Sequence, residues 1–225
     1  MKLLRLVAAA VFVALSGSAR ADDLDKQVPA PGLDPAKGGS SDTVVLAGGC
    51  FWGQQAVFEH VKGVTKVVAG YSGGAANTAV YPLVITETTG HAESVEITFN
   101  PQIVSFGRLL QIYFSVAHDP TELNFQGPDE GASYRSEIFF TTPEQEKTAR
   151  AYMTQLEAAH IFANPIITKI EPLKGFYAAE GYHQDYLIHH PTQPYIVVND
   201  LPKLEALKRV WPNDYRSEPV RLASR

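Results

Sequence analysis

The chain has 225 residues, of which 45% are hydrophobic and 19% are charged, and its formal net charge is −5. This composition is typical of a globular protein and too apolar for a disordered one. The excess of 24 acidic over 19 basic residues leaves no electrostatic footprint for nucleic acid, so nucleic-acid binding is not expected. A single cysteine excludes an intramolecular disulfide and a zinc site built on paired thiolates.

The N-terminal residues have the pattern of an export signal. Lys2 and Arg5 precede an apolar run over residues 6–15, and small residues follow as far as Ala21. A basic start, an apolar stretch of this length and an A-x-A site are typical of a cleavable signal peptide. The run is well short of the ~20 residues that a membrane-spanning helix needs. We therefore expect cleavage of residues 1–21, no stable membrane association, and a periplasmic or secreted product.

Residues 22–42 are expected to form a flexible linker. The segment is rich in proline, glycine and serine and poor in apolar residues, so it cannot bury enough surface to offset the entropy of ordering it. The folded domain is expected over residues 43–215, and residues 216–225 are expected to form a C-terminal tail.

Strand and helix patterns alternate through the rest of the chain without internal repeats. The clearest strand pattern covers residues 93–99, where Val95, Ile97 and Phe99 alternate with polar residues. The alternation indicates a domain in which layers of helices and strands pack together, and it does not predict the order of the strands. Strands are expected over 43–47, 64–71, 93–99, 134–140 and 166–170, and helices over 51–61, 105–117, 143–160 and 202–210.

The stretch Gly48-Gly49-Cys50-Phe51-Trp52-Gly53 places the cysteine at the start of a predicted helix, directly after a strand and a glycine turn. The unpaired N–H groups and partial positive charge of a helix N-terminus stabilise an anion there. We therefore expect the pKa of the thiol to lie below its ordinary value of about 8.5. The glycines leave the approach to the sulfur open, and the two aromatic residues are placed to wall an apolar pocket. The alternative is that Cys50 is a buried small hydrophobe.

Six strings of the sequence, in this order, are similar to the peptide methionine sulfoxide reductases of the A type. They are GGCFWG at 48–53, GYSGG at 70–74, TGHAE at 89–93, HDPTELNFQGPDEGASYRSEIFF at 118–140, GYHQDYL at 181–187 and PYIVVNDLPKLEALK at 194–208. The resemblance runs from about Thr43 to Tyr215. It implies an α+β fold, a ferredoxin-like sandwich with a mixed or antiparallel sheet flanked by helices. It also implies reduction of methionine sulfoxide, free or in proteins, and therefore repair of oxidised exported proteins.

Reduction of a sulfoxide needs a soft nucleophile for the sulfur and an acid for the oxygen. Cys50 is the only thiol in the sequence, and Glu93 is the best candidate acid, because burial near aromatic residues and a nearby thiolate disfavour its ionisation. By resemblance, Glu93 holds the proton-donor position of the family. The resemblance also places Tyr81, Tyr134 and Asp129 around the same centre, where phenol groups can hydrogen-bond the sulfoxide oxygen.

The aromatic residues of the first motif are expected to bind the substrate. Phe51 and Trp52 would enclose the methyl group on the substrate sulfur, with Gly49 at the approach, and the resemblance assigns the S epimer. His183 and Tyr186 are expected to border this pocket. The spacing of histidines 183, 189 and 190 is not that of a ligand set, and no cysteine joins them, so we expect no metal and no other bound cofactor.

The sequence lacks the recycling cysteines that many members of this family carry near the C-terminus. Attack on the sulfoxide would leave Cys50 as a sulfenic acid. An external thiol would then resolve it through a mixed disulfide. Thioredoxin-like proteins, glutaredoxins and small thiols all fit this role. We expect the protein to be a monomer.

Two other classes of function use some of the same residues. A cysteine hydrolase would take Cys50 as nucleophile, His183 as base and Asp185 to orient the base, but it would leave Glu93 and the aromatic pair without a role. A non-catalytic module would bind oxidised or apolar side chains without changing them. Formation of methionine from a sulfoxide substrate separates a reductase from both.

Overall fold

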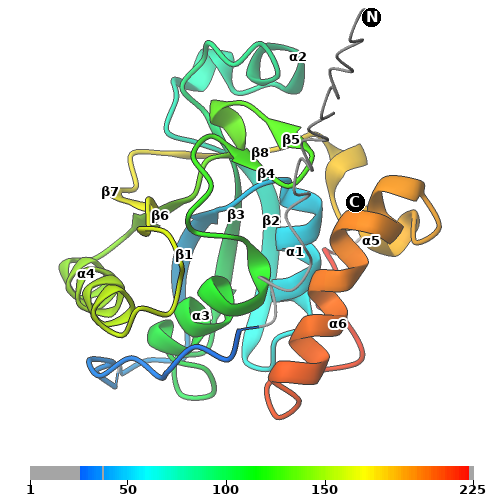
Figure 1. The fold of residues 1–225 in the computed structure, drawn as a ribbon. Helices are drawn as coiled ribbons and strands as arrows, with labels where there is room; N and C mark the ends of the chain where they lie inside the picture. The colour runs from blue at the N-terminus through cyan, green and yellow to red at the C-terminus, as the bar shows by residue number, and fades with distance from the viewer. Residues whose placement is uncertain (1–25, 37, 223–225) are drawn as a thin grey trace, which may run out of the picture.

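The computed structural model describes residues 26–36 and 38–222. A six-stranded sheet forms the centre of this part of the chain (Figure 1). Neighbouring strands are antiparallel except for one pair at one edge of the sheet, which makes the sheet mixed, as expected. The strand order is β7 (Lys169–Pro172), β6 (Glu137–Phe140), β1 (Asp42–Ala47), β3 (Ala92–Phe99), β2 (Val64–Ser72) and β8 (Phe176–Ala178), with β6 and β7 parallel.

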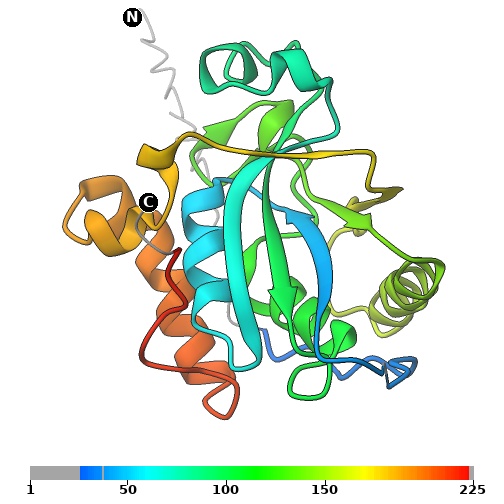
Figure 2. The same ribbon diagram turned by 180° about the vertical axis from the view of Figure 1, so that it is seen from behind.

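Helices flank this sheet mainly on one side. The helices α1 (Phe51–Glu59) and α3 (Phe106–Ile112) lie in front of the strands in Figure 1, and the strands lie in front of them in the opposite view (Figure 2). The helix α6 (Leu201–Val210) packs on α1, and α4 (Pro143–Ala158) lies beside the edge formed by β6 and β7. The main core fills the space between sheet and helices. Its largest fully buried side chains include Phe58, Tyr71, Phe99, Leu109 and Tyr113.

The helix α1 is almost completely buried. Eight of its nine residues are buried, because the sheet covers one side of the helix and α6 covers another. Because the helix is covered on both sides, its polar residues Gln54, Gln55 and Glu59 are buried as well. Buried polar groups must find hydrogen-bond partners, and those partners connect α1 to the segments that surround the site described below.

Most of the elements expected from the sequence are present. The strands over 43–47, 64–71 and 93–99 and the helices over 51–61 and 143–160 form within two residues of the expected bounds. In β3, Val95, Ile97 and Phe99 are completely buried, as the alternating pattern predicts. The α+β class with a mixed sheet flanked by helices is confirmed.

Three expected elements differ in their bounds because tertiary contacts override the local pattern. The helix expected over 105–117 changes at Tyr113 into the π-helical turn η3 (Tyr113–Ala117). The strand expected over 134–140 starts only at Glu137, because the short helix η4 (Ala132–Tyr134) ends in a turn closed by Tyr134 N–H and the Gly131 carbonyl. The strand expected over 166–170 lies at β7, since Ile167 N–H instead bonds the Pro120 carbonyl at 2.9 Å.

Residues 26–36 are packed against the domain, which differs from the flexible linker expected over 22–42. Val28 is only 1% exposed and belongs to the main core. The other contacts are polar, because the backbone carbonyls of this proline-rich segment are free to accept hydrogen bonds from side chains on neighbouring helices. The donors to Val28, Pro29 and Ala30 carbonyls are Gln111, Tyr152 and Gln155, and Asp34 accepts from the N–H of Gly107.

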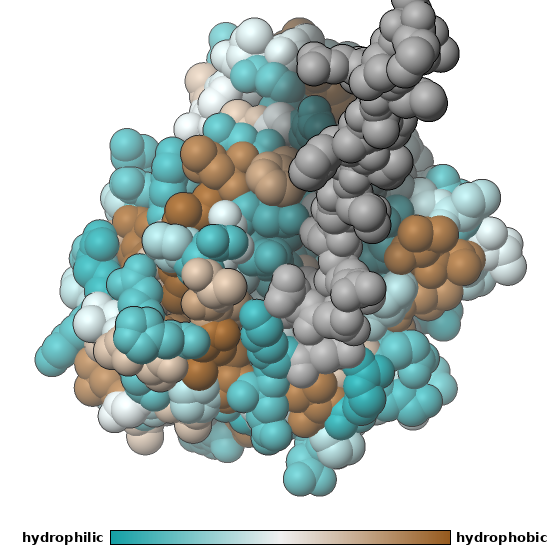
Figure 3. Space-filling view, in the orientation of Figure 1, coloured by the Kyte–Doolittle hydropathy of each residue, from teal (hydrophilic) through white to brown (hydrophobic). Residues whose placement is uncertain are grey.

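The surface carries small apolar groups among hydrophilic residues on the face shown in Figure 3. Exposed large apolar side chains include Val80, Leu83 and Ile85, in and beside the short helix α2 (Tyr81–Val84). No helix within residues 26–36 and 38–222 is long and apolar enough to cross a membrane. The expected signal peptide over 1–21 lies outside the described residues.

Candidate active site

Cys50 stands at the junction between β1 and α1. The strand ends at Ala47, and Cys50 is the N-cap residue of the helix. Gly49 has a φ of +87°, and a Cβ atom there would lie 2.7 Å from Cβ of Gln126, so only glycine fits this turn. Its N–H donates to the Tyr134 carbonyl at 3.1 Å. The turn therefore fixes the sulfur at the start of the helix, where its residue is 7% exposed.

Glu93 lies directly beside this helix start. It belongs to β3, at the end of the sheet where β1 ends, and only 3% of the residue is exposed. The backbone N–H of Phe51 donates to Oε2 of Glu93 at 3.0 Å. Burial raises the pKa of Glu93 to about 8, partly offset by this hydrogen bond and reinforced by the charge of Asp129. The carboxyl group is therefore largely protonated at neutral pH and can donate a proton.

The prediction of a lowered thiol pKa is wrong. Burial raises the pKa of Cys50 well above its ordinary value, and the nearby carboxyl groups of Glu93 and Asp200 raise it further, whereas the N–H of Trp52 lowers it. The helix N-terminus does favour an anion, but the N–H of Phe51 is already bound to Glu93. Desolvation and carboxyl groups outweigh the remaining helix effect, so Cys50 is a thiol in the resting protein.

Tyr81 and Tyr134 face the same centre. Burial raises the pKa of both phenols, and the negative charges of Glu93 and Cys50 are among the further causes for each. Both side chains are therefore protonated donors close to the thiol and to Glu93. Asp129, in the short strand β5 (Asp129–Glu130), is held by a hydrogen bond from the hydroxyl of Tyr195. The structure thus brings the predicted acid, phenols and carboxylate together around the thiol.

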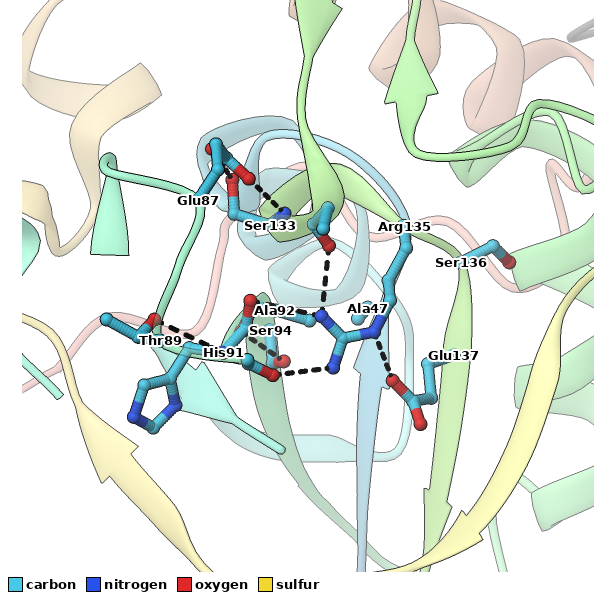
Figure 4. A network of polar contacts seen from close by, with 12 residues as sticks. Ala47, Glu87, Thr89, His91, Ala92, Ser94, Ser133, Arg135, Ser136 and Glu137 are labelled. Carbon is cyan, nitrogen blue, oxygen red and sulfur yellow. Dashed lines mark hydrogen bonds and ion pairs between the residues drawn. The ribbon is translucent and has the colours of Figure 1, made fainter. Parts of the chain in front are cut away.

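A polar network joins Ser133 and Arg135, the two neighbours of Tyr134 in sequence, to the segment from Glu87 to His91 that precedes Glu93 (Figure 4). The guanidinium of Arg135 donates to the carbonyls of Gly90 and His91, each at 3.0 Å, and forms an ion pair with Glu137 at 2.6 Å. Glu87 accepts hydrogen bonds from the backbone N–H and hydroxyl of Ser133, at 2.8 and 2.7 Å. Arg135 can bridge several acceptors because its guanidinium carries five donors in a rigid plane. The TGHAE and YRS motifs are therefore joined through this one side chain.

Aromatic rings form one wall of the site. Trp52 stacks on Tyr186 with ring centroids 3.8 Å apart and an interplanar angle of 7°. The indole N–H of Trp52 donates to Nδ1 of His183 at 3.2 Å. The ring of Phe51 lies 5.0 Å from that of His183. His183 and Tyr186 therefore support the two aromatic residues of the first motif from behind, and Trp52 is fixed in orientation by both.

Buried polar groups of α1 hold the segment that carries His183 and Tyr186. Gln55 accepts from the N–H of Asp185 at 2.9 Å and donates to the side chain of Gln184 at 3.2 Å. Burial, followed by a hydrogen bond with Asp185, raises the pKa of Glu59 to about 10. Glu59 is therefore a neutral acid beside Asp185, and α1 positions both Cys50 and the aromatic support.

These contacts do not favour the cysteine hydrolase. Nδ1 of His183 accepts from Trp52, and Nε2 lies 4.0 Å from Glu180, so neither ring nitrogen is directed at the thiol by a hydrogen bond. Asp185, the expected orienting residue, pairs with Glu59. Within residues 26–36 and 38–222, no group of three or more His, Cys, Asp or Glu side chains is arranged to hold a metal ion.

Three residues near the site were not singled out by the sequence analysis. Tyr195 binds Asp129 and meets the Trp52 ring edge-on at 5.9 Å. Glu180 accepts from the hydroxyl of Tyr71 and from the N–H of Tyr81, each at 2.9 Å. Asp200 is completely buried. Tyr195 and Asp200 lie in the PYIVVND string, and their burial beside Cys50 depends on contacts between segments far apart in sequence.

Comparison with known proteins identifies the family. A family model described as peptide methionine sulfoxide reductase matches residues 42–215. The chain is 55% identical over 192 residues to the peptide methionine sulfoxide reductase MsrA 2 of Mesorhizobium japonicum, covering 85% of this chain and 98% of that one. It is 45% identical over 208 residues to the protein of the same name from Synechocystis sp., covering 90% and 96%.

Two solved structures share the fold. The crystal structure of Mxr1 from Saccharomyces cerevisiae in reduced form has a TM-score of 0.63 and 29% identity, covering 72% of this chain and 92% of that one. Methionine sulfoxide reductase A of Corynebacterium diphtheriae has a TM-score of 0.60 and 30% identity, covering 79% and 92%. The chain belongs to the peptide methionine sulfoxide reductase family, and it is an oxidoreductase of the A type, as the resemblance of its motifs implied.

We predict that the thiol of the native protein reacts slowly with iodoacetamide at neutral pH. The midpoint of the pH dependence of alkylation should lie above the ordinary cysteine value of about 8.5, because burial and carboxyl groups disfavour the thiolate. The single cysteine makes the rate unambiguous, and the urea-unfolded chain serves as the control with an ordinary midpoint. A native midpoint below that of the unfolded chain would contradict this account.

Proposed function

We propose that the chain reduces the S epimer of methionine sulfoxide by attack of the Cys50 sulfur on the substrate sulfur, with Glu93 as the proton donor. The observation that carries this proposal is the hydrogen bond from Phe51 N–H to Glu93, which sets a buried, protonated carboxyl group beside the sulfur. A sulfoxide oxygen becomes a better leaving group when it gains a proton as the S–O bond breaks. Cys50 supplies the nucleophile for the substrate sulfur in that step, and Glu93 supplies the proton for the oxygen.

The step balances without a further oxidant or reductant. The Cys50 sulfur forms a bond to the substrate sulfur. The protonated oxygen then moves to Cys50 as its bond to the substrate sulfur breaks, and the bond between the two sulfurs breaks so that the substrate leaves as methionine. Glu93 gives its proton to the oxygen, and the thiol proton moves to the Glu93 carboxylate. Cys50 is oxidised to the sulfenic acid and the sulfoxide is reduced to the thioether. Both groups start protonated, which agrees with their raised pKa values.

The remaining residues bind the oxygen and the methyl group. The phenols of Tyr81 and Tyr134 are protonated and can donate hydrogen bonds that strengthen as charge develops on the oxygen. Phe51 and Trp52 provide an apolar wall for the methyl group on the substrate sulfur. Separate contacts for the oxygen and the methyl group favour one epimer, and we assign the S epimer, as the resemblance of the motifs to the family implies.

Regeneration requires an external thiol. The sequence has one cysteine, so the sulfenic acid condenses with an outside thiol, releasing water and forming a mixed disulfide. A second thiol then frees Cys50 and leaves as a disulfide. A thioredoxin-like protein, a glutaredoxin or a small thiol can supply both. With cleavage of residues 1–21, the enzyme would repair oxidised proteins, or reduce free methionine sulfoxide, in the periplasm or outside the cell.

Glu93→Gln should lower the rate of the first turnover by ~10²–10⁴-fold at neutral pH, because an amide can donate a hydrogen bond but cannot deliver a proton. The measurement is methionine formed in a rapid single turnover. Glu96→Gln, on the same strand but partly exposed, is the matched control and should keep the wild-type rate. Cys50→Ser should form no methionine. An unchanged rate in Glu93→Gln would transfer the acid role to Tyr81 or Tyr134.

Without any thiol donor, each molecule should release about one methionine and stop, because no second cysteine can resolve the sulfenic acid. Product is quantified by chromatography, and mass spectrometry with dimedone identifies the oxidised cysteine. Addition of a thiol should restore continuous turnover. Many turnovers in the rigorous absence of thiols would refute the sulfenic acid scheme, and no product at all would leave a binding module as the better description.

A further inference from the structure

Asp200 is a buried carboxylate that does not cap the helix it precedes. It ends the π-helical turn η6 (Ile196–Asp200) and occupies the N-cap position of α6. An aspartate at an N-cap normally accepts a hydrogen bond from the first turn of its own helix, but Asp200 makes no side-chain cap bond. It is 0% exposed, and neither carboxylate oxygen has a hydrogen-bond partner among the residues that the structure describes. The nearest cation is Lys203, whose Nζ lies 3.5 Å from Oδ1.

The carboxylate is pressed against the first turn of α1. A Cβ atom built on Gly53 would lie 2.2 Å from Oδ1 of Asp200 and 3.2 Å from Nζ of Lys203. Gly53 is three residues after Cys50, and residues at this spacing share one face of a helix. The absence of a side chain at Gly53 is therefore what allows the Asp200 carboxylate to reach the backbone beneath the thiol. This contact explains why the GCFWG string ends in glycine, because a side chain at this position would collide with Asp200.

A carboxylate buried in this way is expensive, because burial removes it from water and a single cation at 3.5 Å compensates only part of the loss. Burial raises the pKa of Asp200 to about 6, and Lys203 lowers it, so the group is mainly ionised at pH 7 and above. Its negative charge raises the pKa of Cys50, after burial and the Glu93 carboxyl group, and it is the smallest of the causes that raise the pKa of Glu93, after burial, Asp129 and Glu87.

We propose that Asp200 is a positioning residue of the reductase site: through the gap at Gly53 it places a negative charge beneath α1 that keeps Cys50 as a thiol and Glu93 as an acid. This inference rests on the proposed function, in which both groups begin the reaction protonated. A thiol is also a far weaker nucleophile than a thiolate, so the same charge limits reactions of Cys50 with other electrophiles.

Other groups act on the thiol and must be held constant. Glu93 of β3, Asp129 of β5 and the Trp52 N–H of α1 all affect the pKa of Cys50, and the phenols of Tyr81 and Tyr134 interact with it. Tyr195 also interacts with both Cys50 and Asp200. Substitution of Asp200 by its neutral isostere leaves these groups in place and removes one charge.

The test is the pH dependence of Cys50 alkylation by iodoacetamide in Asp200→Asn. Loss of the charge should lower the thiol pKa, which raises the alkylation rate at a fixed pH below the midpoint, by about tenfold. Glu205→Gln, an exposed carboxylate on the same helix α6, is the matched control and should behave as wild type. An Asp200→Asn midpoint equal to that of the control would overturn the proposal.

A second variant guards against a folding defect. Asp200→Asn leaves Lys203 buried without its partner, whereas Asp200→Asn/Lys203→Met removes both charges, and replacing a buried ion pair by neutral residues is often tolerated. Far-ultraviolet circular dichroism confirms folding, and the double variant should show the same direction of shift. A folded double variant with the wild-type midpoint would equally overturn the proposal.

The catalytic readout separates this inference from the proposed function. In Asp200→Asn, the pH at which the first-turnover rate falls should move lower, because Glu93 loses its proton more easily. Alkylation does not require sulfoxide reduction. If Glu93→Gln keeps full activity while Asp200→Asn still shifts alkylation, the proposed acid is wrong and the role of Asp200 at the thiol stands. If Glu93→Gln loses activity but Asp200→Asn leaves the alkylation midpoint unchanged, the proposed role of Asp200 is wrong and the role of Glu93 as the acid is kept.

Discussion

The hydrogen bond from the backbone N–H of Phe51 to Glu93 is the interaction on which the site depends. A helix N-terminus offers unpaired donors, and here one of them binds a buried carboxyl group next to the sulfur. The contact joins the end of β1, the start of α1 and β3, which the antiparallel pairing of β1 with β3 already places side by side. Nucleophile and acid are thus positioned by backbone geometry, with no need for long flexible side chains.

The surrounding structure keeps that contact in place from three directions. Arg135 ties the loop bearing Tyr134 to the residues before Glu93. Gln55 ties the segment bearing Tyr186 to α1, and Tyr186 in turn stacks on Trp52. On the third side the buried carboxylate of Asp200 meets the helix at Gly53. The result is a low-dielectric site in which Cys50 and Glu93 retain their protons, because burial disfavours the charged form of each.

Sequence reasoning reached the parts of this arrangement that depend on local pattern and on recognisable motifs. The strand, glycine turn and helix around Cys50 follow from residues close together in the chain. The motif strings lead to Glu93 and Tyr134, and Tyr81 follows from the resemblance to the family. The direction of the thiol pKa could not be predicted, because it depends on burial and on carboxyl groups from distant segments. The contacts of Tyr195 with Asp129 and of Asp200 with Gly53 could not be predicted for the same reason. The packing of residues 26–36 was missed because its contacts are hydrogen bonds to backbone carbonyls, which leave no apolar pattern in the sequence.

The central claim is that the reaction starts from a protonated Glu93 and a thiol, and the pH dependence of the first-turnover rate tests it most directly. Because burial raises the pKa of Glu93 to about 8, its proton is present below that pH and is lost as the pH rises through it. The account predicts a rate that is high near neutral pH and falls through about pH 8. A rate that rises steadily from neutral pH to pH ~9, as ionisation of an ordinary cysteine thiol would produce, would contradict it.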